Sequence, residues 1–502
     1  MKKPQRSSSL SFCIPWLAVL MLAGGCAVGP EFKAPTAEVP ADFSAWHGGS
    51  AELLDTQARD AAGMPIGWSA FADPVLDALM AKALDANHDL QTAALRFAQS
   101  RVQRQQAEAQ RGPQLNASAA AARQRQSEFG SGTRLIDALN PSNREQLIGA
   151  LSEPHNLYQA GFDASWELDL WGRVRRAVEA ADADVDASQA MLAQVQLAVQ
   201  SELARNYFEL RTAQRQLRIA RDDIAASDES LTLVKARADG GLTTDLDVRR
   251  QAAQTADLRA RLPQLLAQEA QTTNRITLLL GERPGTLQAQ LAAPADGPAG
   301  ALPDLSPGLP SEVALRRPDI RRAQAQLHSA TASIGVAVAD LYPHITLGAN
   351  FGLESVGSRN FGEWGSRQWS IGPSLQLPLF DGARRRSTVT LRELQQQEAV
   401  VAYQQAVLKA WHEIDDALSA YAAERQRHLQ LADKERQSRD AWELARVRYA
   451  HGLTDFLVQL DAQRTLLQAQ RDQVDSGGRL AMDLVMLTKA LGGAEDRNAA
   501  RR

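Results

Sequence analysis

The chain has 502 residues, with 55 Lys and Arg against 59 Asp and Glu, a formal net charge of −4 and 2 Cys. The near balance of charge argues against a nucleic-acid-binding protein, and 44% hydrophobic with 23% charged residues argues against intrinsic disorder. Two Cys exclude a disulfide framework and Cys-rich metal clusters. Packing or assembly must therefore stabilise the fold.

The N-terminal residues have the pattern of a secretory signal. Lys2 and Lys3 begin it, residues 14–22 form a short apolar core, and small residues precede Cys26. This pattern resembles a bacterial lipoprotein signal, which is cleaved before the cysteine and acylated on its thiol. Ala27, rather than Asp, implies by the same resemblance an outer-membrane destination. An ordinary cleaved signal that happens to contain a cysteine is the alternative.

Two long segments contain neither Gly nor Pro. They are residues 173–239 and 383–451, both rich in the strong helix formers Ala, Gln, Leu, Arg and Glu. At 1.5 Å per residue each would form a helix of about 100 Å. A compact globular domain has no room for such rods, so an elongated structure is predicted.

The first of these segments carries a heptad pattern. Its companion positions are mostly small, which favours close approach of a neighbouring helix. The seven-residue repeat is Leu203, Leu210, Leu217, Ile224 and Leu231, with Val199, Asn206, Ala213, Ala220, Ser227 and Val234 as companions.

Matching motifs show that the chain is duplicated. Residues 87–90 match 317–320 at an offset of 230, and Leu280-Gly281 matches Leu491-Gly492 at an offset of 211. The first copy must therefore hold an insertion between Pro113 and Gly172. A Pro-rich stretch between the copies reads as a linker. The expected organisation is a signal peptide at 1–25, a lipidated extension at 26–65, a first repeat at 66–281, a linker at 282–310, a second repeat at 311–492 and a tail at 493–502.

Four shorter segments alternate between apolar and polar or small residues, which predicts strands at 113–124, 157–171, 343–356 and 368–381. About ten residues suit a tilted membrane-crossing strand, although half-buried strands of a soluble sheet give the same pattern. No later segment reaches the roughly 18 apolar residues of a transmembrane helix. Four strands cannot close a barrel, and lipid does not tolerate open sheet edges, so several chains would have to share one barrel.

The order of the motifs resembles that of the TolC-type outer-membrane factors, specifically the NodT-type efflux lipoproteins. The resemblance covers nearly the whole mature chain. The motifs are Cys26-Ala27-Val28-Gly29-Pro30, Trp166-Glu167-Leu168-Asp169-Leu170-Trp171-Gly172-Arg173, Leu377-Pro378-Leu379-Phe380-Asp381-Gly382, Arg448-Tyr449, Gly452-Leu453 and Leu460-Asp461-Ala462-Gln463-Arg464.

The resemblance implies a mainly α fold with a membrane β-barrel part. A homotrimer would form one 12-strand outer-membrane barrel, continued through the periplasm by an α-helical barrel. The implied function is a passive exit duct for drugs or other small toxic compounds. The implied partners are a periplasmic adaptor and an inner-membrane pump, usually of the resistance-nodulation-division class, together with outer-membrane lipid. No cofactor is expected beyond the lipid on Cys26.

A permanently open duct would breach the outer-membrane barrier, so a gate is expected. By resemblance, Leu457, Asp461 and Arg464 carry the constriction, at i, i+4 and i+7 on one helical face. Symmetry would repeat Asp461 around the axis, where the acidic ring attracts cations. An ordinary i, i+3 surface pair of Asp461 with Arg464 is the alternative.

Turns between long helices should form the periplasmic tip. Each turn has Gly for a left-handed C-terminal residue and Thr as the following N-cap, and Thr244 with Asp247 makes a capping-box-like pair. By resemblance, Asp247 and Tyr449 tie the inner helix hairpin to its neighbour. The expected adaptor contacts are Gly240, Gly241, Leu242, Thr243, Gly452, Leu453 and Thr454.

Enzyme and metal sites find little support in the sequence. The eight His are scattered, and His412-Glu413 lacks the second His of a zinc helix, so no catalytic residue and no metal site is expected. The main alternative function is a trimeric coiled-coil structural or adhesive lipoprotein without a conducting pore. Polar residues on one face of the strands, such as Asp163 and Glu167, favour a water-filled barrel over such a stalk.

Overall fold

The computed structural model describes residues 27–35, 68–139, 141–292 and 316–493. The chain divides into two compact units. The first unit comprises residues up to 34, 99–185 and 326–400, and the second comprises 35–98, 186–325 and 401–502. Both sequence repeats therefore contribute to both units.

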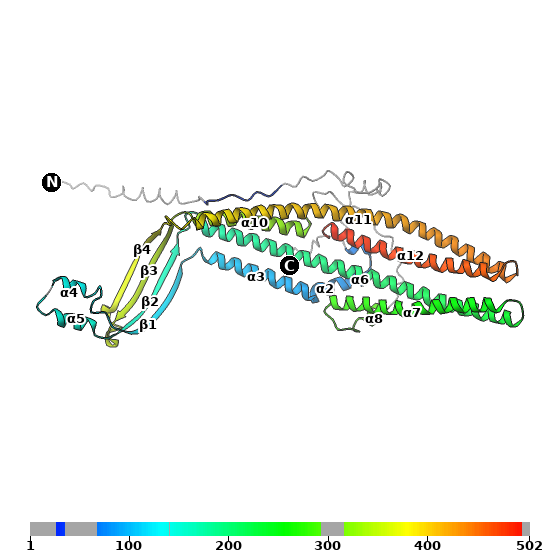
Figure 1. The fold of residues 1–502 in the computed structure, drawn as a ribbon, viewed down its shortest axis with the longest axis horizontal. Helices are drawn as coiled ribbons and strands as arrows, with labels where there is room; N and C mark the ends of the chain where they lie inside the picture. The colour runs from blue at the N-terminus through cyan, green and yellow to red at the C-terminus, as the bar shows by residue number, and fades with distance from the viewer. Residues whose placement is uncertain (1–26, 36–67, 140, 293–315, 494–502) are drawn as a thin grey trace, which may run out of the picture. The chain divides into compact units, whose positions relative to one another are not determined.

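The first unit contains a four-stranded antiparallel sheet in the order β1-β2-β3-β4 (Figure 1). β1 and β2 come from the first repeat, and β3 and β4 come from the second. Two short helices, α4 and α5, lie between β1 and β2, where the offset between the repeats places the insertion. The bounds are β1 Gln114–Gln124, α4 Arg134–Leu139, α5 Arg144–Ser152, β2 His155–Glu167, β3 His344–Ser355, η5 Ser358–Asn360, η6 Trp364–Ser366 and β4 Arg367–Gln376.

Two strands end earlier than the sequence predicts. β2 ends at Glu167 rather than 171, and β4 ends at Gln376 rather than 381. After β2, the carboxylate of Asp169 accepts hydrogen bonds from the Val174 and Arg175 amides at 3.0 and 2.9 Å and so caps the next helix. The alternation of apolar residues continues into these junctions, but the side chains of Asp169 and Asp381 accept hydrogen bonds from the first amides of the following helices.

Long helices dominate the second unit and pair as hairpins. Figure 1 shows α6 and α7 as one hairpin and α11 and α12 as the other. α6 begins and ends at the predicted residues, and α11 lies one residue inside its expected range at each end. The bounds of the remaining elements are η4 Trp68–Phe71, α2 Pro74–Ala86, α3 His88–Ala109, α6 Arg173–Asp239, α7 Asp245–Leu279, α8 Gln288–Ala292, α10 Pro318–Ala339, α11 Arg384–Ala450 and α12 Phe456–Ala490.

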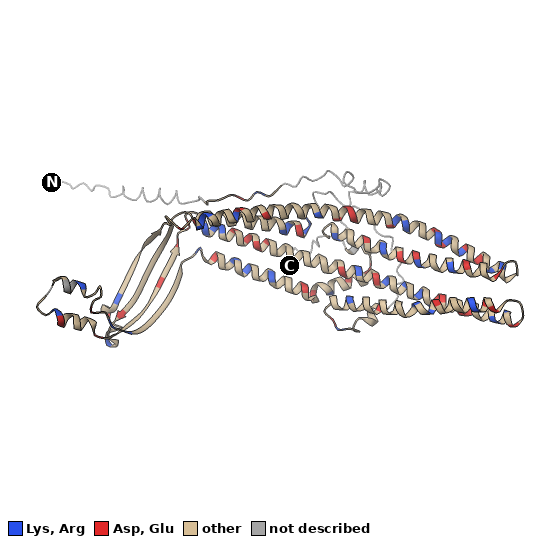
Figure 2. Ribbon diagram, in the orientation of Figure 1, with Lys and Arg blue, Asp and Glu red and all other residues tan. Residues whose placement is uncertain are grey.

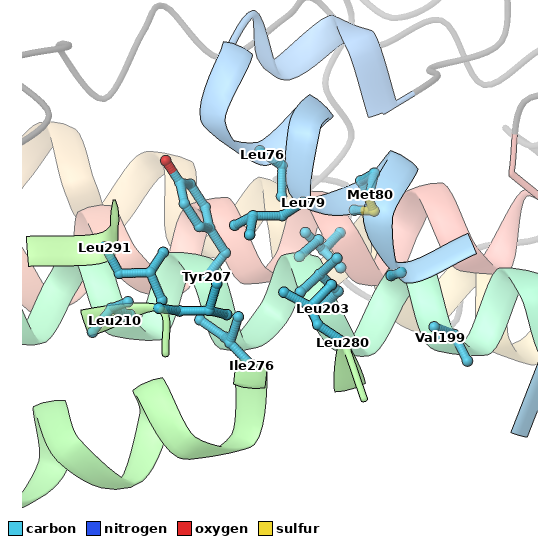
Figure 3. Close-up of a cluster of buried hydrophobic side chains, with 14 residues drawn as sticks. Leu76, Leu79, Met80, Val199, Leu203, Tyr207, Leu210, Ile276, Leu280 and Leu291 are labelled. Atoms are coloured by element: carbon cyan, nitrogen blue, oxygen red, sulfur yellow. The ribbon is translucent and has the colours of Figure 1, made fainter. Parts of the chain in front are cut away.

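The largest hydrophobic cluster joins five helices of the second unit (Figure 3). Tyr207 of α6 lies in it, and its hydroxyl donates a 2.6 Å hydrogen bond to Asp73. Burial, reinforced by this contact, raises the pKa of Tyr207 to about 12. The buried members are Leu76, Leu79, Met80, Ala83, Val199, Leu203, Ala204, Tyr207, Leu210, Ile276, Leu280, Leu287, Leu291 and Val485.

The heptad positions of α6 are largely buried. Leu203, Leu210 and Leu217 are almost fully buried, and so are the small companions Ala213 and Ser227. The small positions therefore let neighbouring helices pack closely against α6. Among the described residues, no helix has both the length and the apolar content that a membrane span requires.

Candidate functional site

The sheet has one apolar and one polar face. Because paired residues of neighbouring strands share a face, the register fixes which side chains lie together. One row across the sheet is Ala117, Phe162, Phe351 and Trp369, and the three aromatic side chains in it are exposed. The adjacent row, on the opposite face, is Asn116, Asp163, Asn350 and Ser370.

Hydrogen bonds connect side chains along the polar face. Asn116 donates to Asp163 at 3.0 Å, and Gln159 donates to Glu354 at 2.7 Å. The strands are otherwise almost free of charge, whereas Lys, Arg, Asp and Glu are distributed along the helices (Figure 2). A sheet with an exposed apolar face and a hydrogen-bonded polar face is typical of a wall between lipid and water.

Glu167, expected on the polar face, lies at the end of β2. Its carboxylate forms an ion pair with Arg173 at the start of α6, with a nitrogen-to-oxygen distance of 2.6 Å. Trp171 stacks on Tyr342 and donates to the carbonyl of Pro343 at 2.9 Å. Phe380, at the matching place in the second repeat, is 93% exposed. The two aromatic residues thus have different surroundings: Trp171 is held by packing, and Phe380 is exposed.

The turn between α6 and α7 is a compact helix-to-helix connection. Gly241 has φ +70°, the left-handed conformation that ends a helix, and the Leu242 amide donates back to the Arg237 carbonyl at 2.8 Å. Thr244 is the N-cap of α7 and forms a capping box with Asp247. The side chain of Leu242 is 79% exposed at the end of the hairpin.

Asp247 organises this turn. One carboxylate oxygen accepts hydrogen bonds from the hydroxyls of Thr243 and Thr244 at 2.8 and 2.9 Å. Burial alone would raise its pKa, but these bonds, the Thr244 amide and Arg250 lower the pKa below its ordinary value. Within this protomer, Asp247 therefore serves its own turn.

The turn between α11 and α12 has the same form with one difference. Gly452 has φ +71°, and the Leu453 amide donates to the Arg448 carbonyl at 2.8 Å. The N-cap is Asp455 rather than the expected Thr454. The prediction of a Thr cap is wrong here because α12 begins at Phe456, so the residue matching Thr244 at the offset of 211 is Asp455.

The three predicted gate residues share an exposed face of α12. Leu457, Asp461 and Arg464 are all exposed. The adjacent face, with Phe456 and Leu460, is buried. The gate residues are thus presented outward by a helix whose neighbouring face is fixed by packing.

Arg464 contacts the other hairpin. Its Nε atom donates a 2.7 Å hydrogen bond to the Oε1 atom of Gln254 on α7. Among the described residues, no ion pair joins Arg464 to Asp461. Arg464 instead links α12 to α7.

A second contact between hairpins surrounds Tyr449. Its ring lies 5.5 Å from that of Phe456, and the guanidinium of Arg237 lies over it at 4.7 Å. Val234 of α6 and Leu460 of α12 are buried in the same cluster. The Tyr449 hydroxyl is buried without a partner among the described residues. The structure does not pair Tyr449 with Asp247 within the chain.

Sequence reasoning missed the polar contacts between α6 and α7. Ser227 and Thr255 are buried with their hydroxyls 2.9 Å apart, and Gln251 donates to the Ser227 hydroxyl at 3.0 Å. The sequence signal for these contacts is Ser227 itself, a polar residue at a small companion position of the heptad pattern.

Cys26, the predicted lipidation residue, lies outside the described residues, which begin at Ala27.

The chain matches the family model described as outer membrane efflux protein over residues 79–282 and 309–493. It is 33% identical to the outer membrane protein OprJ of Pseudomonas aeruginosa over 498 residues, covering 99% of this chain and 97% of OprJ. It is also 29% identical to the probable outer membrane lipoprotein SilC of Salmonella typhimurium, covering 95% and 97%.

The fold is similar to the solved structure of the outer-membrane channel OprN. The TM-score is 0.82 at 33% identity, covering 93% of this chain and 99% of that one. The resemblance to TolC-type outer-membrane factors is thereby confirmed, and with it a mainly helical fold and a place in the outer membrane. The chain belongs to the outer membrane efflux protein family.

Proposed function

We propose that this chain is the outer-membrane exit duct of a tripartite efflux system, conducting drugs or other small toxic compounds passively across the periplasm and outer membrane. The observation that carries the proposal is the two-faced sheet. Its apolar face suits lipid, and its row of Asn116, Asp163, Asn350 and Ser370 suits a water-filled interior. A structural or adhesive stalk would not require a polar sheet face of this kind.

The duct would be a homotrimer. The sheet ends in β1 and β4, whose outer edges have no strand partner among the described residues. Open edges are not tolerated in lipid, so β1 of one protomer would pair with β4 of the next. Three copies would give a 12-strand barrel, in keeping with the family resemblance, and the long helices would continue it as an α-helical barrel.

The partners would be a periplasmic adaptor and an inner-membrane pump, most simply of the resistance-nodulation-division class. The helix turns offer apolar contacts for the adaptor, since Leu242 and Leu453 are 79% and 67% exposed. Gly240, Gly241, Thr243, Gly452 and Thr454 would shape these tips.

The gate would be the periplasmic end of α12. Symmetry would place three copies of Asp461 around the axis, with Leu457 narrowing the opening. The closed state would be held by the Arg464 bond to Gln254 and by the packing of Arg237 on Tyr449. Opening would then require the α11–α12 hairpin to move from α6–α7. In the trimer, Asp247 and Tyr449 would also meet the neighbouring hairpin.

Lipid on Cys26 would anchor the duct in the outer membrane. The residues before it form a lipoprotein-type signal, and SilC is named as a probable lipoprotein.

Detergent behaviour distinguishes the duct from the stalk. Purified full-length protein should form heat-resistant trimers that require detergent and show a strong β signal by circular dichroism. Trimers of a Cys26→Ser variant that stay soluble without detergent would contradict the duct and favour the stalk.

A further inference from the structure

The second unit contains a cavity of about 520 Å³ at the point where α12 ends and α10 begins. The Nη1 atom of Arg317, just before α10, donates a 2.7 Å hydrogen bond to the carbonyl of Ala490, the last residue of α12. Residues of α6 and α11 complete the lining of the cavity. Pockets that hold small molecules have volumes in this range.

The cavity lies away from the main hydrophobic core and is accessible to solvent. Gln194 lines it from α6, whereas Leu203 of the same helix belongs to the largest hydrophobic cluster. From Gln194 to Leu203 the helix makes about two and a half turns, so these side chains lie on opposite faces of α6. Met486 in the lining is 48% exposed, and Asp416 is also exposed, so a solute can reach the space.

Part of the charge in the lining is neutralised within the chain. Arg317 is only 6% exposed, and its guanidinium donates to the carboxylate of Asp319 at 3.0 and 2.7 Å. The same guanidinium donates to Glu413 at 2.6 Å, and Lys409 lies 3.6 Å from the other oxygen of Glu413. These two cations and two carboxylates therefore satisfy one another, and the buried guanidinium is compensated.

Three acceptors in the same lining have no partner. They are the carboxylates of Asp416 on α11 and Asp483 on α12 and the buried Oε1 atom of Gln194, none of which accepts a hydrogen bond or an ion pair from a described residue. Lys489, the remaining cation of the lining, is exposed and acts on Glu202, which lies outside the lining. A ligand with N–H donors would satisfy the three free acceptors.

The chain's own cations leave Asp483 uncompensated. Burial, reinforced by the nearby negative charge of Glu424, raises the pKa of Asp483 above its ordinary value, and Arg479 opposes this shift only in part. A bound cation would supply the missing positive charge.

The first repeat has a similar helix junction with different side chains. There Asn87 donates a 2.8 Å hydrogen bond to the last carbonyl of α7, so a neutral amide joins α7 to the chain just before α3. At the offset of 211 that relates the two long hairpins, Asp416 and Asp483 match Arg205 and Thr272. The two free carboxylates thus belong to the junction of the second repeat.

We infer that this cavity is a binding site for an amphipathic organic cation, such as a protonated amine or a guanidinium with an apolar body. The N–H groups of the ligand donate to the carboxylates of Asp416 and Asp483 and to the amide oxygen of Gln194. Its body packs on the apolar part of the lining, which includes Leu197 and Met486. The site goes beyond the proposed duct, and only the further step, that such cations are cargo, rests on that function.

Fluorescence anisotropy of the purified, detergent-extracted trimer tests the site with two dyes. Proflavine is a planar aromatic cation with amino donors, and fluorescein is an anion at neutral pH with a similar three-ring core. Proflavine should bind saturably, with one dye per protomer. Fluorescein should bind at least about tenfold more weakly, because it brings negative charge to unpaired carboxylates.

Variants of the lining separate the site from adsorption to the detergent. Asp416→Asn and Asp483→Asn should each raise the Kd for proflavine about tenfold, because each removes a contact to a charged group. Asp440→Asn, at an exposed acid of α11 outside the lining, is the matched control and should leave the Kd unchanged. Ala420→Phe leaves both carboxylates in place but fills part of the space, so it should also weaken binding.

Equal affinity of the wild type for both dyes would overturn the site, and so would the absence of saturable proflavine binding. A Kd that is the same in the wild type and in all three lining variants would overturn it as well. Trimers that conduct but do not bind proflavine would contradict the site alone. Trimers that bind proflavine with the expected variant pattern but stay electrically silent would support the site and contradict the duct.

Discussion

Single side chains fix the geometry of the hairpin tips. Asp247 accepts hydrogen bonds from two threonine hydroxyls, and Arg464 reaches from α12 to Gln254 on α7. One contact shapes a turn within a hairpin, and the other joins two hairpins. Replacing Asp247 should therefore loosen its turn, whereas replacing Arg464 should make it easier for the two hairpins to separate.

Asp247→Ala should loosen the first turn of α7. Loss of a capping residue costs about 1 kcal/mol, so amide exchange at residues 243–248 should accelerate about fivefold. Asp245→Ala, at an exposed acid of the same turn, should have little effect. Because the pKa of Asp247 is lowered in the folded chain, its stabilisation is present above about pH 4. It should be lost as the pH falls from there through the lowered pKa, and exchange independent of pH over that window would contradict this role.

Arg464→Ala should make the duct open more readily. A hydrogen bond from a charged donor contributes about 1.5–3 kcal/mol, so its loss should raise the open population at least about tenfold. The measurement is uptake of an antibiotic too large for general porins, in cells with equal amounts of the protein. Arg249→Ala, which removes an exposed arginine near the same tip, is the control. Equal uptake by both variants would count against the link to Gln254 as part of the gate.

At the scale of elements, the sequence predicted the long helices best. The absence of Gly and Pro fixed both ends of α6, and alternation located all four strands. Strand ends were misplaced because apolar alternation continues past Glu167 and Gln376 into junctions that cap helices. The Arg464–Gln254 and Arg237–Tyr449 contacts could not be predicted, since pattern and periodicity do not reveal which polar side chains meet across two hairpins.

The two helix turns should act together as a docking surface. Leu242→Asp and Leu453→Asp would place a carboxylate in an apolar interface, which costs more than the 1.5–3 kcal/mol of the lost leucine burial. Resistance to efflux substrates should fall to that of a deletion strain, with the protein still present in the outer membrane. Leu429→Asp, at an equally exposed leucine of α11, should retain resistance. Resistance retained by both tip variants would contradict docking at the turns.

A buried acid between three helices should make the bundle sensitive to pH. Asp223 of α6 is 9% exposed, with Asp222 beside it, Arg471 on α12 and Arg261 on α7 nearby. Burial, aided by Asp222, outweighs both arginines and raises the pKa of Asp223 to about 6. Because the pKa of Asp223 is higher in the folded state, the folded state binds its proton more tightly than the unfolded state. The free energy of unfolding should therefore fall as the pH rises from about 4 to about 6.

Asp223→Asn should remove this slope. At pH 7 the variant should be more stable by up to about 3 kcal/mol, seen as loss of helical circular dichroism at a higher temperature under a fixed heating rate. Asp222→Asn, at the exposed neighbour, should keep the slope. If the stability of Asp223→Asn depended on pH as steeply as that of the wild type, the slope could not be assigned to Asp223.

At the scale of the whole molecule, duplication supplies the strands and the long hairpins in pairs, and the first repeat adds an insertion with α4 and α5. Each repeat gives two strands and one long hairpin, and the sheet is complete only with both. The predicted gate residues Leu457, Asp461 and Arg464 lie in the second repeat. The duplicated strands and hairpins thus form a wall of two similar halves, and the predicted gate departs from that similarity.

Planar-bilayer conductance of the purified, detergent-extracted protein shows directly whether the trimer is a gated duct. We expect small discrete conductance steps for the wild type. We expect larger or longer openings when Asp461→Asn removes the acidic ring, and unchanged steps for Asp245→Asn at an exposed acid of the other hairpin. Electrical silence from well-folded trimers, in the wild type and in the gate variants alike, would contradict a gated duct.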